Sequence, residues 1–181
     1  MAGTAATERD AQHLLRAIEL AGRARGQTSP NPMVGAVVVK DGRVIGEGIT
    51  QPPGESHAEV MALEAAAGHT AGATMYVTLE PCCHQGRTPP CTDAIISAGI
   101  SRVVIASDDP TPKAAGRGPG ILRDEGLRVD FVDGHIGEAA RMLNQPFRKH
   151  ARTGRPLVVL KSAMTLDGYY SVRQQQGHHN K

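Results

Sequence analysis

Four side chains in this sequence are of the types that hold and use a zinc ion: His57, Glu59, Cys82 and Cys91. One imidazole and two thiolates are zinc ligands, and the two negative charges offset the +2 of the ion. Three protein ligands leave a fourth position for water, whereas structural zinc sites normally fill it with protein. Glu59, two residues from the imidazole, can move protons for that water. The set therefore predicts hydrolytic attack on an amidine-like ring carbon with release of ammonia.

The spacing of His57 and Glu59 also has a structural interpretation. Ser56 and Glu59 match a helix capping box, in which Glu59 would only bond back to the backbone of Ser56. Residues two apart on a regular helix face nearly opposite ways. The catalytic interpretation therefore requires a helix that begins at or just before His57.

The three cysteines allow other assignments. Cys82 and Cys91 could pack as small buried residues, and Cys83 could replace Cys82 as a ligand. The polar, proline-rich run 84–90 is a poor setting for core packing and favours metal binding. An odd number of cysteines, two of them adjacent, suits reduced thiols better than a disulfide framework.

The elements that must position these residues alternate between helix and strand. We predict helices over residues 7–21, 56–67, 91–98, 118–125 and 136–149, and strands over 34–40, 43–49, 73–79, 102–106 and 128–132. Asp41-Gly42 between the first two strands is a strong hairpin signal. His57 and Cys91 fall at helix starts, where the helix dipole favours a thiolate. The alternation predicts a mixed sheet covered by helices on both faces.

Composition narrows the class of protein. The 181 residues, of which 40% are apolar, are enough for one domain with a short appendage. The net charge of +2, the 3% aromatic content and the absence of tryptophan argue against nucleic-acid binding. The longest apolar stretches are too short to cross a bilayer, and residues 1–10 lack an apolar signal core. We expect a cytoplasmic protein with no membrane partner.

Several motifs together resemble one known family. They are Ser29 to Gly35, His57 to Val60, Thr78 to Cys82, Gly86 to Ala94 and Ala115 to Gly118. They resemble the deaminase domain of the bifunctional riboflavin biosynthesis deaminase/reductase, and the likeness runs from about residue 11 to 168. The general deaminase signature has only two residues between its cysteines, whereas this branch has eight, as between Cys82 and Cys91 here. The resemblance implies the cytidine-deaminase-like α/β fold, a three-layer α/β/α sandwich around a mixed sheet of about five strands.

The resemblance also implies a reaction. Its substrates are 2,5-diamino-6-(5-phosphoribosylamino)pyrimidin-4(3H)-one and water, and its products are 5-amino-6-(5-phosphoribosylamino)uracil and ammonia. The residues that match the family's zinc ligands are His57, Cys82 and Cys91, and Glu59 matches its proton shuttle.

Three further residues match positions that contact substrate: Asn31, His84 and Arg87. An amide can hydrogen-bond a ribose or base edge, and a guanidinium can hold a phosphate. Asn31 could instead be a turn residue between two prolines, and Arg87 a solvated loop charge. His84 is interpreted as a substrate contact rather than as a zinc ligand.

Two positions depart from the family pattern near the substrate. Thr50 stands where the family usually has a histidine, and Thr111 stands where it usually has an asparagine. Both changes leave the metal ligands intact. They weaken the prediction of the substrate more than the prediction of the reaction type. A related aminopyrimidine or a pterin-like ring is therefore an alternative substrate.

The end of the chain predicts an incomplete second domain. Residues 1–150 form the expected deaminase domain, and residues 151–168 resemble the linker and first strand of the family's reductase domain. Thirteen residues cannot complete a nicotinamide-binding domain, so we expect no reductase activity, and a separate reductase is a candidate partner. Leu157 to Leu160 would be an apolar strand in need of a partner. Residues 169–181 are polar and glutamine-rich, and we expect them to be disordered.

Three functional hypotheses follow. The first is a zinc-dependent riboflavin-pathway deaminase, which the resemblance implies to be a homo-oligomer. The second is a deaminase of another base, such as cytidine or guanine, or with less support a nucleic-acid editor. The third is a non-catalytic module in which zinc only staples loops, and a fourth protein ligand such as His84 or Cys83 would support it.

Overall fold

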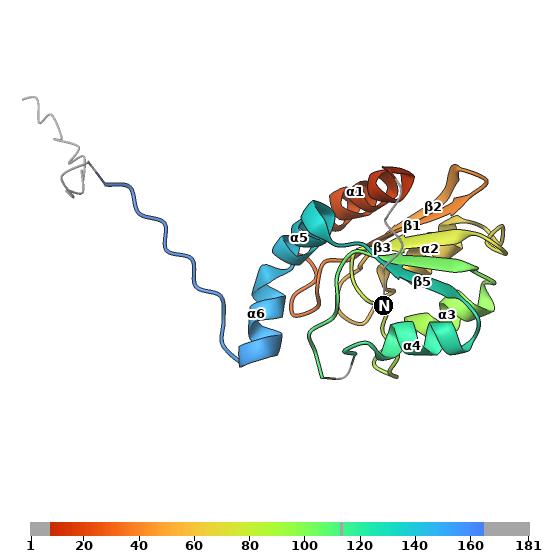
Figure 1. The fold of residues 1–181 in the computed structure, drawn as a ribbon. Coiled ribbons are helices and arrows are strands. Elements are labelled where there is room, and N and C mark those ends of the chain that lie inside the picture. Colours follow the sequence, from red (N-terminus) through yellow and green to blue (C-terminus); the bar gives the residue numbers. More distant parts are fainter. Residues whose placement is uncertain (1–7, 113, 165–181) are drawn as a thin grey trace, which may run out of the picture.

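Within its described residues, the chain forms six helices packed around one five-stranded sheet (Figure 1). The structure is a computed structural model, and it describes residues 8–112 and 114–164. The elements in chain order are α1 (Glu8–Gly22), β1 (Gly35–Lys40), β2 (Arg43–Ile49), α2 (Ala58–Ala65), β3 (Thr74–Val77), α3 (Cys91–Ser97), β4 (Arg102–Ile105), α4 (Arg117–Asp124), β5 (Arg128–Phe131), α5 (Gly134–Leu143) and α6 (Gln145–Thr153).

The five strands form a mixed sheet in the order β2-β1-β3-β4-β5. β1 is antiparallel to β2 and to β3, whereas β3, β4 and β5 run parallel. The predicted hairpin joins β1 to β2, and Asp41 and Gly42 have φ values of 51° and 74°, the left-handed conformation that a type I′ turn requires. The expected fold class is confirmed.

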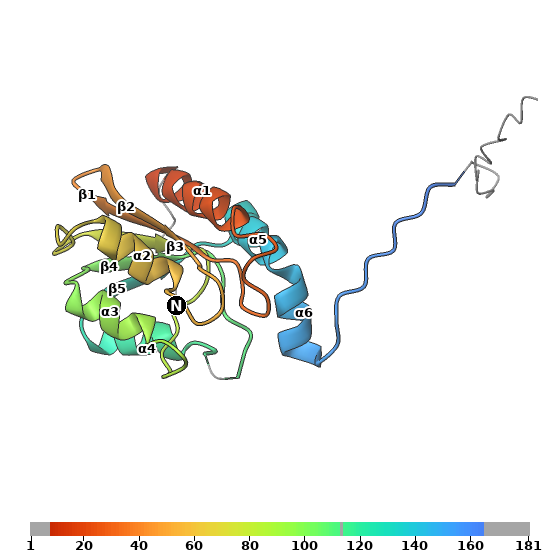
Figure 2. The same cartoon turned by 180° about the vertical axis from the view of Figure 1, so that it is seen from behind.

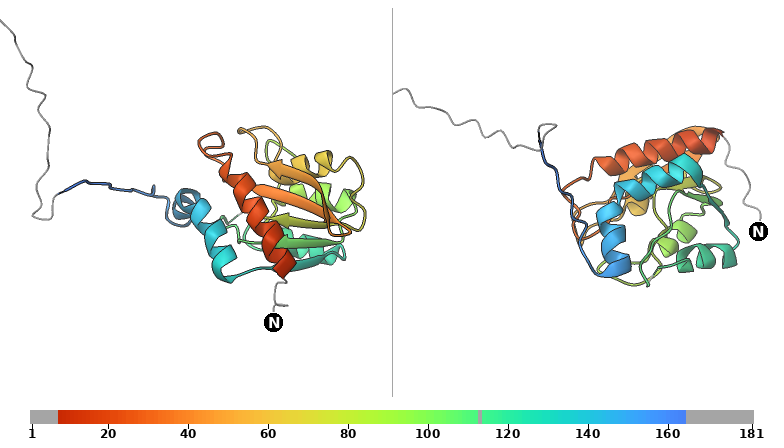
Figure 3. Two further views of the ribbon diagram at one scale, coloured as in Figure 1. Left: turned by 90° about the horizontal axis from the view of Figure 1, so that it is seen from above. Right: turned by 60° about the vertical axis from the view of Figure 1, so that its left-hand side comes forward.

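Helices cover both faces of this sheet (Figures 1 and 2). α1 and α5 pack on one face, where Leu14 and Ile136 meet Val37. α2, α3 and α4 pack on the other, where Ala62 and Leu122 belong to the same buried cluster as the strand residues. Successive residues of β1 alternate between the two clusters, because side chains of a strand point to opposite faces. The view from above in Figure 3 shows the three layers edge-on.

Two glycines of β2 let helix α2 lie unusually close to the sheet. A Cβ atom on Gly46 would lie 2.1 Å from the carbonyl oxygen of Ala62. A Cβ atom on Gly48 would lie 2.1 Å from the carbonyl oxygen of Ala58. Both neighbours are backbone atoms that cannot rotate away. The Gly-x-Gly pattern therefore sets the position of the helix on which the candidate proton shuttle lies.

The helix predicted over 136–149 is instead two helices, α5 and α6. They meet at Asn144, whose φ of −104° and ψ of 23° lie outside the helical range. Pro146 explains the break, because proline has no N–H and its ring clashes with the preceding turn of a helix. The same residue is well tolerated in the first turn of the new helix.

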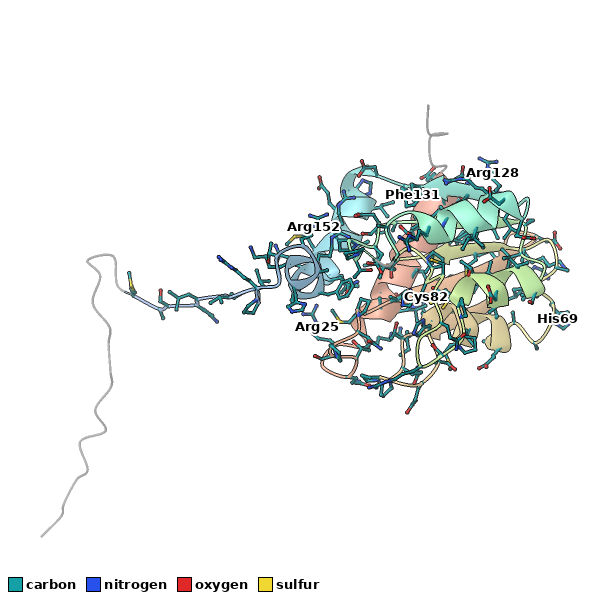
Figure 4. All side chains as sticks on the ribbon, turned by 90° about the horizontal axis from the view of Figure 1, so that it is seen from below. Arg25, His69, Cys82, Arg128, Phe131 and Arg152 are labelled. Atoms are coloured by element: carbon teal, nitrogen blue, oxygen red, sulfur yellow. The ribbon has the colours of Figure 1, made fainter. Side chains whose placement is uncertain are left out.

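Beyond α6, the chain runs away from the folded body. Figure 4 shows this extended segment leading outward beyond Arg152. Val158, Val159 and Leu160 are 81%, 79% and 90% exposed. No strand of the described part of the chain includes residues 157–160, so the strand predicted there is not formed. The predictions for Thr7 as a helix start and for a disordered tail over 169–181 lie outside the described residues. Among the described helices, none has the length and apolar content to cross a membrane.

Candidate metal centre and substrate cavity

The three predicted ligands converge in space. The Nδ1 atom of His57 lies 3.1 Å from the Sγ atom of Cys91 and 3.5 Å from the Sγ atom of Cys82. The three ligand atoms all lie within 4.8 Å of one another. Tetrahedral zinc, with bonds of about 2.0 Å to nitrogen and about 2.3 Å to sulfur, separates its ligand atoms by roughly 3.5 Å. The donor set and its spacing therefore fit a zinc ion.

His57 reaches this position because it caps α2 rather than belonging to it. Its φ of −76° and ψ of 163° are extended, and Ala58 is the first helical residue, so the expectation that the helix begins at or just before His57 is wrong by one residue. The change of backbone conformation at His57 removes the opposite-facing geometry of a regular helix, so His57 and Glu59 line the same cavity. No side-chain hydrogen bond caps α2, so the capping-box alternative for Ser56 and Glu59 is wrong.

The first turn of α3 surrounds Cys82. The N–H of Cys91 donates to the Sγ atom of Cys82 at 3.3 Å, and the N–H of Thr92 donates to the carbonyl oxygen of Cys82 at 3.2 Å. A hydrogen bond from the Cys91 thiol lowers the pKa of Cys82, and bonds from His57 and the Cys91 backbone act in the same direction. The pKa of Cys91 is raised, because its thiol hydrogen-bonds Cys82 and because the side chain is buried. Cys82 is thus favoured as a thiolate, and a bound cation has to displace the proton of Cys91.

The other candidate ligands are not part of this group. Neither Cys83 nor His84 joins the cluster that the described part of the chain forms, which contains three residues. Burial raises the pKa of Cys83, which favours the neutral thiol. The geometry therefore supports Cys82 over Cys83, and it gives no support to a fourth protein ligand from either residue.

Glu59 is a buried carboxyl beside the ligand sulfurs. Its exposed fraction is 4%, and it hydrogen-bonds the thiol of Cys91. Burial, followed by the negative charge of Cys82, raises the pKa of Glu59 to about 7. A carboxyl with a pKa near the working pH can both accept and donate a proton.

One cavity of about 490 Å³ joins the candidate metal centre to the predicted substrate contacts. His57, Glu59 and Cys82 line it together with all three predicted substrate contacts, Asn31, His84 and Arg87. Cys91 is fully buried. In the view from below in Figure 4, Cys82 lies within the body of the molecule, whereas His69 and Arg128 lie at its rim. The volume is in the range of small-molecule sites.

The sequence profile of one protein family matches residues 7–107 and is described as the cytidine and deoxycytidylate deaminase zinc-binding region. The chain belongs to this deaminase family. The match contains all three residues of the metal-binding group, so the family identity agrees with a zinc-binding site at His57, Cys82 and Cys91.

Individual proteins of known sequence or structure show which members of the family this chain is similar to. The chain is 52% identical over 161 residues to the riboflavin biosynthesis protein RibD of Aquifex aeolicus. The aligned region covers 89% of this chain and 45% of that protein. Among solved structures, it is similar to the diaminohydroxyphosphoribosylaminopyrimidine deaminase/5-amino-6-(5-phosphoribosylamino)uracil reductase of Thermotoga maritima, at a TM-score of 0.81 and 47% identity over 88% of this chain and 46% of that one. It is also similar to a C-terminal deletion mutant of the Rib2 deaminase of Aspergillus oryzae, at a TM-score of 0.65 and 25% identity over 80% of this chain and 97% of that one. The chain thus spans about half the length of the curated relatives it matches.

Several residues of this deaminase cavity were not predicted as site residues. Among them are Glu80, Asp109 and Phe147. Glu80 is buried, and its Oε1 atom accepts the N–H of Gly116 at 2.7 Å, so it ties the start of α4 to the cavity. Its place two residues before Cys82 was a signal for it. Phe147 had no signal, because it lies on a helix far along the chain from every motif.

Thr50 and Thr111, the two departures from the family pattern, both line this cavity. The hydroxyl of Thr50 accepts the N–H of Val34 at 3.1 Å and lies 3.4 Å from the carbonyl oxygen of Val34. Thr50 therefore holds the start of β1 as well as lining the cavity. The N–H of Thr111 donates to the Oδ1 atom of Asp109 at 2.8 Å, which shapes the adjacent wall.

Proposed function

We propose that this chain deaminates 2,5-diamino-6-(5-phosphoribosylamino)pyrimidin-4(3H)-one to 5-amino-6-(5-phosphoribosylamino)uracil, with His57, Cys82 and Cys91 holding zinc. The observation that carries the proposal is a buried carboxyl, Glu59, beside a three-residue ligand group in one cavity of about 490 Å³. Deaminases named for the riboflavin pathway are about half identical to this chain over most of its length, which supports the choice of substrate.

The walls of the cavity suit a phosphorylated aminopyrimidine. His84 and Arg87 come from the eight-residue segment between Cys82 and Cys91. A guanidinium at the cavity can form two parallel hydrogen bonds with a phosphate, and the amide of Asn31 can accept from and donate to a base or ribose edge. We assign Arg87 to the phosphate and Asn31 and His84 to the ring and sugar.

Zinc held by this group would supply Lewis acidity, which makes water a nucleophile at neutral pH. Glu59 takes the proton of the attacking water and gives it to the ring nitrogen next to the reacting carbon. It then takes the remaining proton from the attacking oxygen and gives it to the amino group, which leaves as ammonia while the carbon retains the oxygen as a carbonyl. The first transfer needs Glu59 as the carboxylate and the second needs it as the carboxylic acid, and burial, which raises the pKa of Glu59, favours the acid form.

The first test is a steady-state assay of ammonia release by the purified protein with its zinc content measured. The diaminopyrimidine phosphate is compared with cytidine and guanine as substrates. We expect about one zinc per chain and turnover of the diaminopyrimidine. Preferred turnover of cytidine or guanine would favour a deaminase of another base, and tightly bound zinc without any turnover would favour a non-catalytic zinc module.

The role of Glu59 is tested by Glu59→Gln, which keeps the shape of the side chain and removes its proton transfer. We expect zinc to stay bound and the rate to fall by about a hundredfold or more. Glu64→Gln, an exposed residue of the same helix, is the matched control and should retain the full rate. Near-normal turnover by Glu59→Gln would refute the assigned role.

The likeness to riboflavin-pathway deaminases also supports finer parts of the proposal. We infer a cytoplasmic enzyme that self-associates. Light scattering of the purified protein measures the molar mass, and a value equal to that of a single 19.1 kDa chain would contradict self-association.

A further inference from the structure

We propose that Asn144 and Arg148 are positioning residues for the deamination, which hold two loops of the substrate cavity from the junction of α5 and α6. The inference rests on the proposed function for its kinetic part. Both residues lie beyond the matched zinc-binding region, which ends at residue 107. They are therefore not part of the segment that carries the candidate metal ligands and Glu59.

Asn144 holds the loop before β1. Its side chain is 2% exposed. Its Oδ1 atom accepts the N–H of Met33 at 2.8 Å, and its Nδ2 atom donates to the carbonyl oxygen of Met33 at 2.8 Å. The amide thus satisfies both backbone groups of one loop residue, as a neighbouring strand would. Pro30, Asn31 and Pro32, the residues just before Met33, line the cavity.

Arg148 holds the loop after β4. It is 5% exposed, and its Nη2 atom donates to both carboxylate oxygens of Asp108, at 2.8 and 3.1 Å. Its Nη1 atom donates to the hydroxyl of Ser107 at 2.9 Å and to the carbonyl oxygen of Asp108. The guanidinium therefore fixes the side chains and the backbone of this pair at once. Asp109 and Thr111, which follow directly, line the cavity.

Asn144 and Arg148 both lie at the start of α6. They are four apart, which places them one turn apart along the start of α6. Phe147, between them in sequence, lines the cavity itself. The first turn of α6 thus contributes one residue that lines the cavity and two residues that each hydrogen-bond a different loop. The break at Pro146 allows this arrangement, because it lets α6 start in a new direction at Asn144.

A purely structural role would predict a different pattern of effects. Loss of either anchor would then lower stability without changing how substrate is bound. A positioning role predicts that the cavity walls move while the metal ligands and Glu59 stay in place. The Michaelis constant should then rise much more than the turnover number falls, because Asn31, Asp109 and Thr111 line the cavity proposed to bind substrate but have no role in the proposed proton transfers.

The experiment compares Asn144→Ala, Arg148→Ala and Arg148→Lys with the control Arg141→Ala. Arg141 lies on α5, forms an ion pair with the exposed Asp133 and does not line the cavity. We expect Asn144→Ala and Arg148→Ala to raise KM about tenfold or more, with kcat within about threefold and zinc content unchanged. Arg148→Lys should recover only part of the loss, because an ammonium cannot reproduce the planar fork. Arg141→Ala should leave KM unchanged.

Hydrogen exchange of the substrate-free, zinc-loaded protein separates this inference from the proposed function. Arg148→Ala should speed exchange in residues 107–111, and Asn144→Ala should speed it in residues 30–34, whichever base the enzyme deaminates. If Arg148→Ala does not fold, Asp108→Ala removes the half-exposed partner and tests the same contact. Unchanged exchange together with unchanged KM in folded variants would overturn the inference, as would a fall in kcat that follows zinc loss.

Discussion

Replacing Gly48 by alanine should displace helix α2 and the site residues that it carries. The new Cβ atom would lie 2.1 Å from the carbonyl oxygen of Ala58 and 2.5 Å from the nitrogen of Ala62. Because real Cβ contacts essentially never fall below 3.0 Å, the two backbones have to separate by at least about 0.9 Å. His57 caps this helix and Glu59 is its second residue, so both move with it.

The size of this displacement sets the expected loss. A misplacement of about 1 Å in a catalytic group costs on the order of a hundredfold in rate. Inserting a methyl group into a tightly packed interface also costs about 1 to 3 kcal/mol of stability. We expect Gly48→Ala to lose about a hundredfold in kcat/KM and to retain less zinc after dialysis, since His57 shifts against Cys82 and Cys91. Zinc analysis, urea unfolding and the ammonia assay measure the three effects.

Gly120→Ala is the matched control for this substitution. Gly120 lies within α4, and a Cβ atom there would meet nothing within 4 Å. Alanine is the better helix former, so this variant should be as stable as the parent or more so, with unchanged activity. The close-packing argument is refuted if Gly48→Ala matches Gly120→Ala in stability, zinc content and kcat/KM.

Three other predictions concern the metal centre and the core. Cys91→Ala should abolish zinc retention on gel filtration while Cys83→Ala preserves it; equal retention by both would exclude the three-residue ligand set. Zinc removal by a chelator should lower the free energy of unfolding by roughly 4 kcal/mol relative to protein in free zinc a thousandfold above Kd, and an unchanged urea midpoint would contradict this. Burial and a hydrogen bond to Asp10 raise the pKa of Tyr76 to about 12. Since the unfolded value is about 10, the stability that Tyr76 contributes is present below pH 10 and is lost as the pH rises toward 12. Between pH 10 and 12, the free energy of unfolding should therefore fall more steeply with pH for the parent than for Tyr76→Phe. Equal slopes would count against the buried hydrogen bond.

The metal centre could be predicted from sequence because its parts have local signatures. His57 lies directly before a helix and Cys91 begins one, so helix-start signals already placed both ligands at element ends. The turn at Asp41-Gly42 likewise has a signature in two adjacent residues. Each of these features depends on neighbours within a few positions, where chain geometry leaves few choices.

The anchors of the cavity could not be predicted in the same way. Asn144 and Met33 are 111 residues apart, and no local pattern in either segment indicates the other. The periodicity of residues 136–149 suggested one helix, although Pro146 marked the break between α5 and α6. In this case the proline signal outweighs the helical pattern, because a missing N–H and a ring clash cannot be compensated by burial.

The cavity is lined both by residues inside the matched zinc-binding region and by residues that follow it, and this difference bears on specificity. The matched zinc-binding region contains the candidate ligands and Glu59, on which the proposed hydrolysis depends whichever base is attacked. Asp109, Thr111 and Phe147 follow that region and line the same cavity, so they can change the shape of the ring that enters without touching the proton transfers. Substitutions at Glu59 should accordingly slow every substrate by a similar factor. Substitutions at Thr111 and Phe147 should instead change the ratio of kcat/KM between the diaminopyrimidine and other bases, because specificity is a difference in transition-state binding.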